Sequence, residues 1–189
     1  TLGPLLANLP EGHRSAPEPE AMRGLYSKSW SLELLKSLLS SMDEGQDWIC
    51  DSGIVGEICS SPEQVRDCLD RLSATGHSQV VIKGPFGAAG QDQIRLAIKH
   101  DSETDSFEAT MTGAKTAWLQ RLLRDFGEVV VEPWLAGRID LSAQFMTEPD
   151  RPIRFLGITR FVTDARGQYA GSFIHHKVAG LDEDERRFL

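Results

Sequence analysis

The sequence has few cysteines, few aromatic residues, no long apolar run and fewer basic than acidic residues. Lys and Arg number 20 against 28 Asp and Glu, which gives a net charge of −8. This balance argues against nonspecific nucleic-acid binding, which needs clustered cations. No apolar run approaches the roughly 20 residues of a membrane span, and the start lacks the charged-then-apolar order of a signal peptide. We therefore expect neither a nucleic-acid nor a membrane partner.

The three cysteines, Cys50, Cys59 and Cys68, are too far apart for the close pairs that zinc sites use. Cys68 falls on the face of an expected helix, so we expect reduced, buried thiols. Reduced thiols are typical of the cytoplasm, and we expect the protein there.

At 189 residues, with 40% hydrophobic and 25% charged residues, the chain is long enough for one good core or two small lobes. Residues 1–24 are rich in proline, glycine and small polar residues, and we expect a linker or flexible arm there. A linker at the very start indicates a piece of a longer protein, whose remaining domains would be partners of this chain.

Apolar spacing and capping signals predict three helices. Apolar residues at intervals of three and four predict a helix over 29–42, with Lys28 at its start. Ser61, Pro62 and Gln64 predict a capped helix that Gly76 ends. A third helix is expected over 115–126. The apolar stripe of the first helix comprises Trp30, Leu34, Leu35, Leu38, Leu39 and Met42.

Short apolar runs predict strands between and after these helices. Short strands are expected at 48–50 and 57–59, a buried strand over 80–82, and a strand over 93–99 that pairs back on it. Another buried strand is expected over 129–131.

The last third of the chain predicts a strand and a hairpin. Residues 139–145 alternate strictly, which places the apolar ones toward a core and the polar ones together on the other face. Runs over 155–162 and 168–174 flank a turn and predict a hairpin, and Arg154 and Arg160 would project from one side of its first strand. The apolar set facing the core would be Ile139, Leu141, Ala143 and Phe145.

The chemistry centres on residues 80–90, where a buried strand delivers a lysine into a glycine-rich turn. Lys83 is the first polar residue at the strand's exit, so its ammonium can leave the sheet. The glycines permit positive φ and a close approach of backbone N–H groups to phosphate oxygens. An ordinary hairpin turn also explains them, and both interpretations stay open. The turn comprises Gly84, Gly87, Ala88, Ala89 and Gly90.

Two further places are candidates for ligand contact. Lys28 begins a helix, where unpaired N–H groups attract anions; the alternative is an ordinary surface lysine. The sequence Glu132-Pro133-Trp134-Leu135 ends a strand. Because proline cannot continue a central ladder, we expect pairing to stop and the backbone groups near 132–135 to be free to hold an adenine ring. The alternative is a strand that simply ends at a loop.

In order and spacing these parts resemble the ATP-grasp superfamily, as in carboxylate–amine ligases and biotin carboxylase-like enzymes, over roughly residues 25–175. The resemblance implies an α+β, ATP-grasp-like fold of two small α/β lobes with antiparallel sheets and a glycine-rich flap. Residues 25–127 would form the N-terminal subdomain with the phosphate flap, and 128–189 part of the C-terminal subdomain. ATP would be the ligand, with Lys28 and Lys83 on its phosphates.

The same resemblance implies roles for the later residues. Glu132 would accept from the adenine amino group, and the backbone at Trp134 and Leu135 would contact the ring. Asp140 occupies the position of the ribose contact. Arg154 and Arg160 are the candidates for a contact with the transferring phosphate, and we take Arg160 as the catalytic one.

Two departures from the family pattern matter. Gln91-Asp92 stands where the flap often has an arginine. The family's metal-binding carboxylates and asparagine have no counterpart before Leu189, so we expect ligands for Mg²⁺ outside this chain and a fragment that is inactive alone.

The leading hypothesis is the ATP-binding domain of an ATP-grasp ligase that forms an acylphosphate from an unidentified small-molecule carboxylate. One alternative is a noncatalytic nucleotide-sensing or protein-interaction module on such a scaffold. Another is an α+β domain whose glycines serve turns only, in which case Lys83→Ala would leave every ligand response unchanged.

Overall fold

The computed structural model is an α+β fold with two antiparallel sheets, as the sequence predicts. One sheet has four strands in the order β1-β4-β2-β3, and the other has three in the order β5-β6-β7. The description covers residues 23–42, 50–87, 92–98, 111–135, 137, 139–148, 150–164 and 169–173.

The elements follow the sequence prediction closely over the middle of the chain. The four-stranded sheet consists of β1 (Glu57–Cys59), β2 (Gln79–Lys83), β3 (Gln93–Ala97) and β4 (Val129–Pro133). The three-stranded sheet consists of β5 (Asp140–Met146), β6 (Arg154–Thr163) and β7 (Tyr169–Phe173). The helices are α3 (Lys28–Ser41), α4 (Pro62–Ala74) and α5 (Gly113–Phe126), with a 3-10 turn η2 (Ser52–Ile54).

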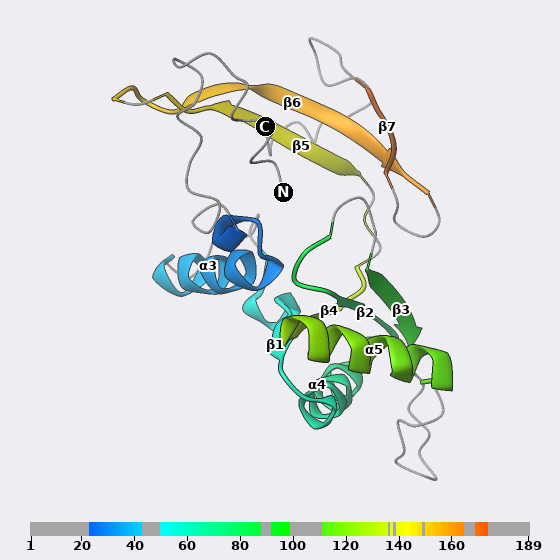
Figure 1. Ribbon diagram of the computed structural model, residues 1–189. Coiled ribbons are helices and arrows are strands. Elements are labelled where there is room, and N and C mark those ends of the chain that lie inside the picture. Colours follow the sequence, from blue (N-terminus) through cyan, green and yellow to red (C-terminus); the bar gives the residue numbers. More distant parts are fainter. Residues whose placement is uncertain are drawn as a thin grey trace, which may run out of the picture.

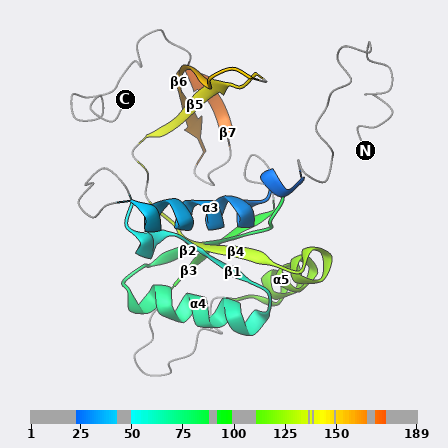
Figure 2. The same cartoon turned by 90° about the vertical axis from the view of Figure 1, so that its left-hand side faces the viewer.

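The elements stack in layers. Helix α3 covers one face of the four-stranded sheet, and α4 and α5 cover the other (Figures 1 and 2). The β5–β7 sheet lies on the α3 side (Figure 2). No helix in the described ranges is long and apolar enough to cross a membrane. The strand expected at 48–50 lies largely outside the described residues, as does most of the arm expected over 1–24.

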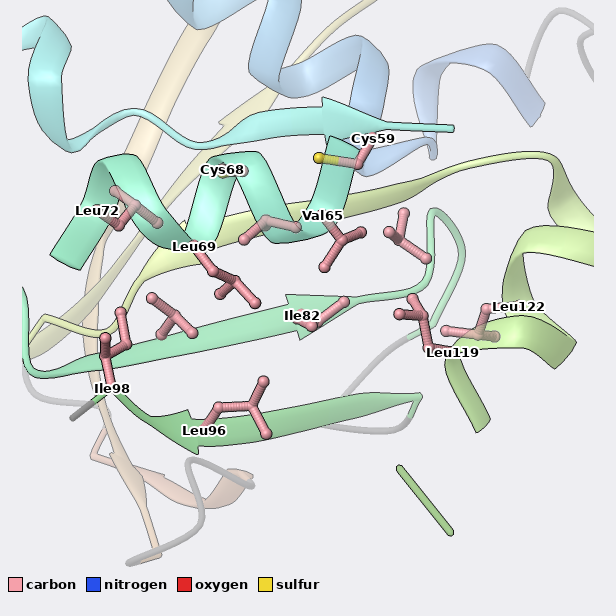
Figure 3. Close-up of a cluster of buried hydrophobic side chains, with 13 residues drawn as sticks. Cys59, Val65, Cys68, Leu69, Leu72, Ile82, Leu96, Ile98, Leu119 and Leu122 are labelled. Carbon is pink, nitrogen blue, oxygen red and sulfur yellow. The ribbon is translucent and has the colours of Figure 1, made fainter. Parts of the chain in front are cut away.

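The main core lies between the four-stranded sheet and helices α4 and α5 (Figure 3). Strands β2 and β4 are the central pair, and their alternate residues point into this core while the residues between them face α3. Two of the three cysteines are in it, and the third, Cys50, is exposed, contrary to the expectation of buried thiols throughout. The core comprises Cys59, Val65, Cys68, Leu69, Leu72, Val80, Ile82, Leu96, Ile98, Leu119, Leu122, Val129 and Val131.

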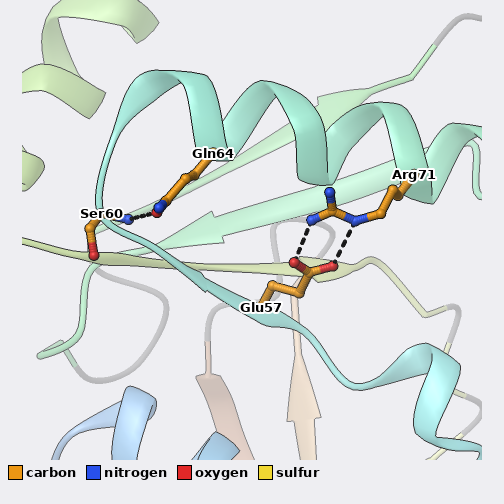
Figure 4. A network of polar contacts seen from close by, with 4 residues as sticks. All are labelled: Glu57, Ser60, Gln64 and Arg71. Atoms are coloured by element: carbon orange, nitrogen blue, oxygen red, sulfur yellow. Dashed lines mark hydrogen bonds and ion pairs between the residues drawn. The ribbon is translucent and has the colours of Figure 1, made fainter.

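Helix α4 confirms its predicted start. The Gln64 N–H donates to the Ser61 hydroxyl at 3.2 Å, with Pro62 in the first turn. The Gln64 side chain accepts from the Ser60 N–H at 2.7 Å, one residue before the cap (Figure 4). Farther along the helix, Arg71 makes a two-pronged ion pair with Glu57 of β1. Local chemistry therefore fixes this helix, since every contact at its start lies within four residues.

Helix α3 has the predicted bounds to within one residue but an unexpected orientation. Its buried residues are Ser29 and Leu32, and the Ser29 hydroxyl donates to the Glu128 carboxylate at 2.5 Å. The apolar stripe is largely exposed; Trp30 is 41% and Leu38 51% accessible. The helix packs on the sheet through the face that carries Ser29, because this small side chain permits a close approach and the hydrogen bond to Glu128. The spacing of the apolar residues alone does not reveal this orientation.

Strand β4 corrects the expectation for proline. Pro133 is still in the ladder, opposite Val80 of β2, and the Trp134 N–H donates to the Gln79 carbonyl at 2.9 Å. Successive residues of a strand present their backbone groups to opposite sides, so the missing N–H of Pro133 points toward β1. Strand β1 pairs only as far as Val131, so no ladder bond is lost.

The three-stranded sheet corrects two further expectations. The apolar residues of β5 are not buried: Leu141 is 38% and Phe145 59% accessible. The β6–β7 hairpin is confirmed, but a bulge displaces the register between β5 and β6, because Gly157 pairs with Gln144 while Phe155 pairs with Phe145. Leu156 is the extra residue, and Gly157 has φ +147°. Arg154 and Arg160 therefore lie on opposite faces of β6. The regular alternation of a strand without a bulge predicts that both lie on one face.

Candidate functional site

A pocket of about 450 Å³ opens between α3, the η2 turn and the ends of β2 and β4. It combines two ammonium groups and one carboxylate with an apolar wall. A pocket of this size is in the usual range for small-molecule sites. Its lining residues are Lys28, Ser31, Leu32, Leu35, Cys50, Ile54, Val55, Gly56, Lys83, Glu132 and Leu135.

Two other pockets lack this combination. One of about 350 Å³ lies between α4 and α5, and Arg66 is the charged residue in its lining. The other, of about 500 Å³, adjoins the first pocket through Leu32 and Val55 and contains Glu33, Lys36 and Glu57. Of these three pockets, the one of about 450 Å³ brings together several of the positions that the sequence singled out.

Lys83 and Glu132 meet on the α3 side of the sheet. Lys83 is the last residue of β2 and pairs with Val130, while Glu132 of β4 pairs with Val81. The two are thus diagonal neighbours on one face, within reach of long side chains. The Lys83 ammonium donates to the Glu132 carboxylate, and the side chains are 24% and 30% accessible.

Lys28 is the first residue of α3, and two hydrogen bonds tie it to the chain that follows β2. Its ammonium donates to the Gly87 carbonyl at 2.7 Å, and its backbone N–H donates to the Pro85 carbonyl at 2.9 Å. Partial burial lowers the pKa of Lys28, and the positive charge of Lys83 lowers it further; Glu132 and Asp92 act in the opposite sense. The positive charge of Lys83 is therefore close enough to Lys28 to lower its pKa.

The glycine-rich turn is described as far as Gly87. Gly87 has φ +156°, as the sequence interpretation requires of a glycine here. Gly84 corrects the expectation, because its φ is not positive and its N–H donates to the Asp92 carbonyl at 2.8 Å, closing the base of the turn. The remaining members, Ala88, Ala89 and Gly90, lie outside the described residues.

The chain after β4 differs from the expectation of free backbone groups. Leu135 lines the pocket, but its carbonyl accepts from the Gly137 N–H at 3.0 Å. The Trp134 N–H already pairs with β2, as described above. The guanidinium of Arg95 lies over the indole ring of Trp134 in a cation–π contact, 4.5 Å from the ring centroid. An adenine contact at Trp134 would thus fall to groups other than its N–H.

Asp140 and Arg160 belong to the second sheet and are not among the described residues that line the pocket. Asp140 accepts a hydrogen bond from the Thr163 hydroxyl at 3.0 Å. Asp140 pairs with Phe161, and Arg160 pairs with Leu141, so the two project from opposite faces of the sheet. The register therefore separates the residue expected at a ribose from the one expected at a phosphate.

Gly56 and Cys50 are among the lining residues that the sequence did not assign to a ligand site. A β-carbon on Gly56 would lie 2.4 Å from Glu132 Cγ and 2.5 Å from the Val131 carbonyl oxygen, so only glycine fits. The signal available in the sequence was a glycine directly before the short strand at 57–59. Cys50 is exposed and lines the same pocket.

The donor set of the described residues does not fit a protein-held Mg²⁺ ion. No three His, Cys, Asp or Glu side chains among them come together as a metal site would require. Hard divalent cations need several oxygen ligands, and the pocket offers one carboxylate, already paired with Lys83.

No protein-family model and no curated protein matches the sequence. Among solved structures, the chain is similar to the crystal structure of N5-carboxyaminoimidazole synthetase from Staphylococcus aureus complexed with ADP, with a TM-score of 0.54 and 13% sequence identity. The match covers 84% of this chain and 35% of that one, so the chain spans about a third of that enzyme's length. That synthetase is an ATP-grasp enzyme. At this identity the likeness concerns the fold, which is similar to that of an ATP-grasp enzyme.

Proposed function

We propose that the chain binds ATP in the pocket between α3 and the β2 and β4 ends, as the nucleotide-binding part of a carboxylate ligase. One observation carries the proposal: lysines from two separate elements converge with Glu132 on a single apolar-walled pocket, in an ATP-grasp-like fold. Two cations together are suited to a polyphosphate, which a single surface lysine is not.

Each part of the pocket has a task in this proposal. The ammonium groups of Lys28 and Lys83 hold phosphate oxygens, assisted by the positive end of the 14-residue helix α3. Leucine and valine side chains of the wall, including Leu35 and Val55, cover the faces of the base. Glu132 accepts from the exocyclic amino group, which selects adenine over a base with a carbonyl at that position.

The reaction we propose for the whole protein is carboxylate activation. A carboxylate oxygen attacks the γ-phosphorus, the bond to the β,γ-bridging oxygen breaks, and ADP leaves as the acylphosphate forms. An amine or a thiol then displaces the phosphate. The described residues bind and orient the nucleotide in this scheme. The ribose contact of Asp140 and the phosphate contact of Arg160 stay predictions, as do a carboxylate substrate and further domains.

Titration calorimetry of the chain with ATP and MgCl₂ tests the binding, with thermal melting as a second readout. ATP at 100 times its dissociation constant should stabilise the fold by about 2.7 kcal/mol, and each kcal/mol corresponds to a rise of roughly 2–4 °C in Tm. We expect Lys83→Ala and Lys28→Ala to abolish the response. Lys36→Ala, about two turns farther along α3, removes the same charge outside the pocket and should leave it intact.

Two results would contradict the proposal. One is an absence of heat and of any Tm shift at millimolar ATP. The other is a response that Lys36→Ala weakens as much as Lys83→Ala, which would indicate attraction by overall charge and not by the pocket.

A further inference from the structure

The contact between Lys83 and Glu132 joins the two kinds of group in the proposed nucleotide site, one for phosphate and one for the base. Lys83 is assigned to phosphate and Glu132 to the base, yet without ligand they bind each other. We propose that Glu132 is a specificity gate. Without ligand it neutralises Lys83, and it releases Lys83 when a ligand with a hydrogen-bond-donating base donates to the Glu132 carboxylate. The inference rests on the proposed nucleotide-binding function. It adds that Glu132 keeps anions without a base from binding at Lys83.

The geometry places a phosphate bound at Lys83 beside the Glu132 carboxylate. Glu132 and Lys83 project from adjacent strands on the same face, and both side chains are more than two-thirds covered. In such a partly buried place two charges interact more strongly than in open water. A phosphate group that reaches Lys83, whether it shares the ammonium with Glu132 or displaces the carboxylate from it, therefore lies beside a second negative charge.

The remaining groups around the pocket relieve this conflict only in part. The Lys28 ammonium, which donates to the Gly87 carbonyl, adds a second positive charge, and Asp92, which acts electrostatically on Lys28, is paired with Arg121. A bare polyphosphate would thus gain Lys28 but would still lie against the Glu132 carboxylate. A nucleotide differs because its base amino group gives Glu132 a new donor at the moment when its phosphates take Lys83.

Gly56 limits one direction in which the Glu132 side chain can move. The backbone at Gly56 lies so close to Glu132 Cγ that no β-carbon fits between them. The Glu132 side chain therefore cannot turn toward Gly56 to make room for an anion.

The test compares ATP with inorganic tripolyphosphate, which has the charge and length of the phosphate chain but no base. The full chain is titrated with each by calorimetry, as wild type and as Glu132→Gln, a substitution that keeps shape and removes the charge. We expect the wild type to bind ATP at least about tenfold tighter than tripolyphosphate, and Glu132→Gln to bind tripolyphosphate about five- to tenfold tighter than wild type does. Circular dichroism and melting confirm that the variant is folded.

The matched control is Glu33→Gln. Glu33 lies on α3 and lines the adjoining pocket, so its replacement changes net charge equally without touching Lys83. We expect it to alter tripolyphosphate binding by less than about twofold. In the double variant Glu132→Gln/Lys83→Ala the gain in tripolyphosphate affinity should disappear.

The gate is overturned if Glu132→Gln leaves tripolyphosphate affinity unchanged, or if Glu33→Gln raises it as much. Equal affinity of the wild type for ATP and tripolyphosphate would also overturn it, while the proposed ATP site would stand. A wild type and a Glu132→Gln variant that bind neither ligand would refute the proposed function and the gate together.

Discussion

A β-carbon at Gly56 would lie 2.4 Å from Glu132 Cγ, so the turn before β1 and the strand β4 meet without room for any side chain. The Val131 carbonyl oxygen is as close, at 2.5 Å, and cannot move without disturbing the ladder. A residue outside every sequence motif thus restricts the stem of the Glu132 side chain, which carries the carboxylate of the pocket.

We predict that Gly56→Ala lowers the free energy of unfolding by about 1–3 kcal/mol, because the methyl group forces backbone and side chain apart. It should also weaken ATP binding, since Glu132 must shift. Gly113→Ala is the control: Gly113 is in the first turn of α5, a methyl group there would have no other atom within 4 Å, and alanine favours helix. Urea denaturation measures both variants, and an equal loss in both would contradict the role of Gly56.

We predict that iodoacetamide labels Cys50 alone in the native chain and that ATP slows this labelling. Cys50 is exposed in the pocket, whereas Cys59 and Cys68 are buried. The pKa of the Cys68 thiol is raised by its hydrogen bond with Cys59 and by burial, so it stays protonated and unreactive. Mass spectrometry of peptides identifies the labelled site. Protection should be lost in Lys83→Ala; protection that persists there would place ATP elsewhere.

We predict that Lys28→Met weakens ATP binding yet slightly stabilises the fold at pH 7. Burial lowers the pKa of Lys28 from its usual 10.5, so between the folded and unfolded values the unfolded chain binds more protons and stability rises with pH. Below that window the ammonium is charged in both states and its desolvation penalty is complete. The variant should gain less than about 1 kcal/mol, because solvent screens a partly exposed group.

The gain from Lys28→Met should shrink as pH rises through the folded-state pKa toward 10.5, where the wild type loses the charge as well. Urea denaturation at pH 7 and at pH 10 measures this. A variant less stable than wild type at pH 7 would mean that the bond from Lys28 to Gly87 outweighs the desolvation.

We predict that Ser29→Ala lowers the free energy of unfolding by about 1–3 kcal/mol, because the half-buried Glu128 carboxylate loses its donor. Ser40→Ala on the same helix removes only an exposed bond to the Lys36 carbonyl and should stay within about 0.5 kcal/mol of wild type. Chemical denaturation compares the two. An equal change in the free energy of unfolding in both variants would indicate that helix propensity is the cause, and not the loss of the buried contact.

The parts of the fold that follow from local chemistry were predictable. The start of α4 depends on residues 60–64, and the antiparallel pairing of β2 with β3 follows from two apolar runs that are consecutive in the sequence, joined by the glycine-rich segment 84–92. The convergence of Lys28 and Lys83 was suggested by family resemblance, since nothing between them in the sequence fixes their separation.

The parts that depend on contacts between distant segments were not predictable. Pro133 stays in the ladder because β1, more than 70 residues earlier, ends opposite Val131. The apolar stripe of α3 indicated a buried face, but the helix packs through Ser29 on Glu128 instead. The need for glycine at position 56 is visible only when β4 lies beside it.

The bulge in β6 has a consequence for chain length. Leu156 has no partner in β5, and it is 53% accessible, so its removal would leave every flanking pair in place with each side chain on its present face. A deletion at Phe161 instead would shift residues 157–160, which lie between it and the bulge, by one position and so to the opposite face. In an alignment, a gap at position 156 would therefore be structurally silent, whereas the same gap five residues later would exchange the two surfaces of that stretch.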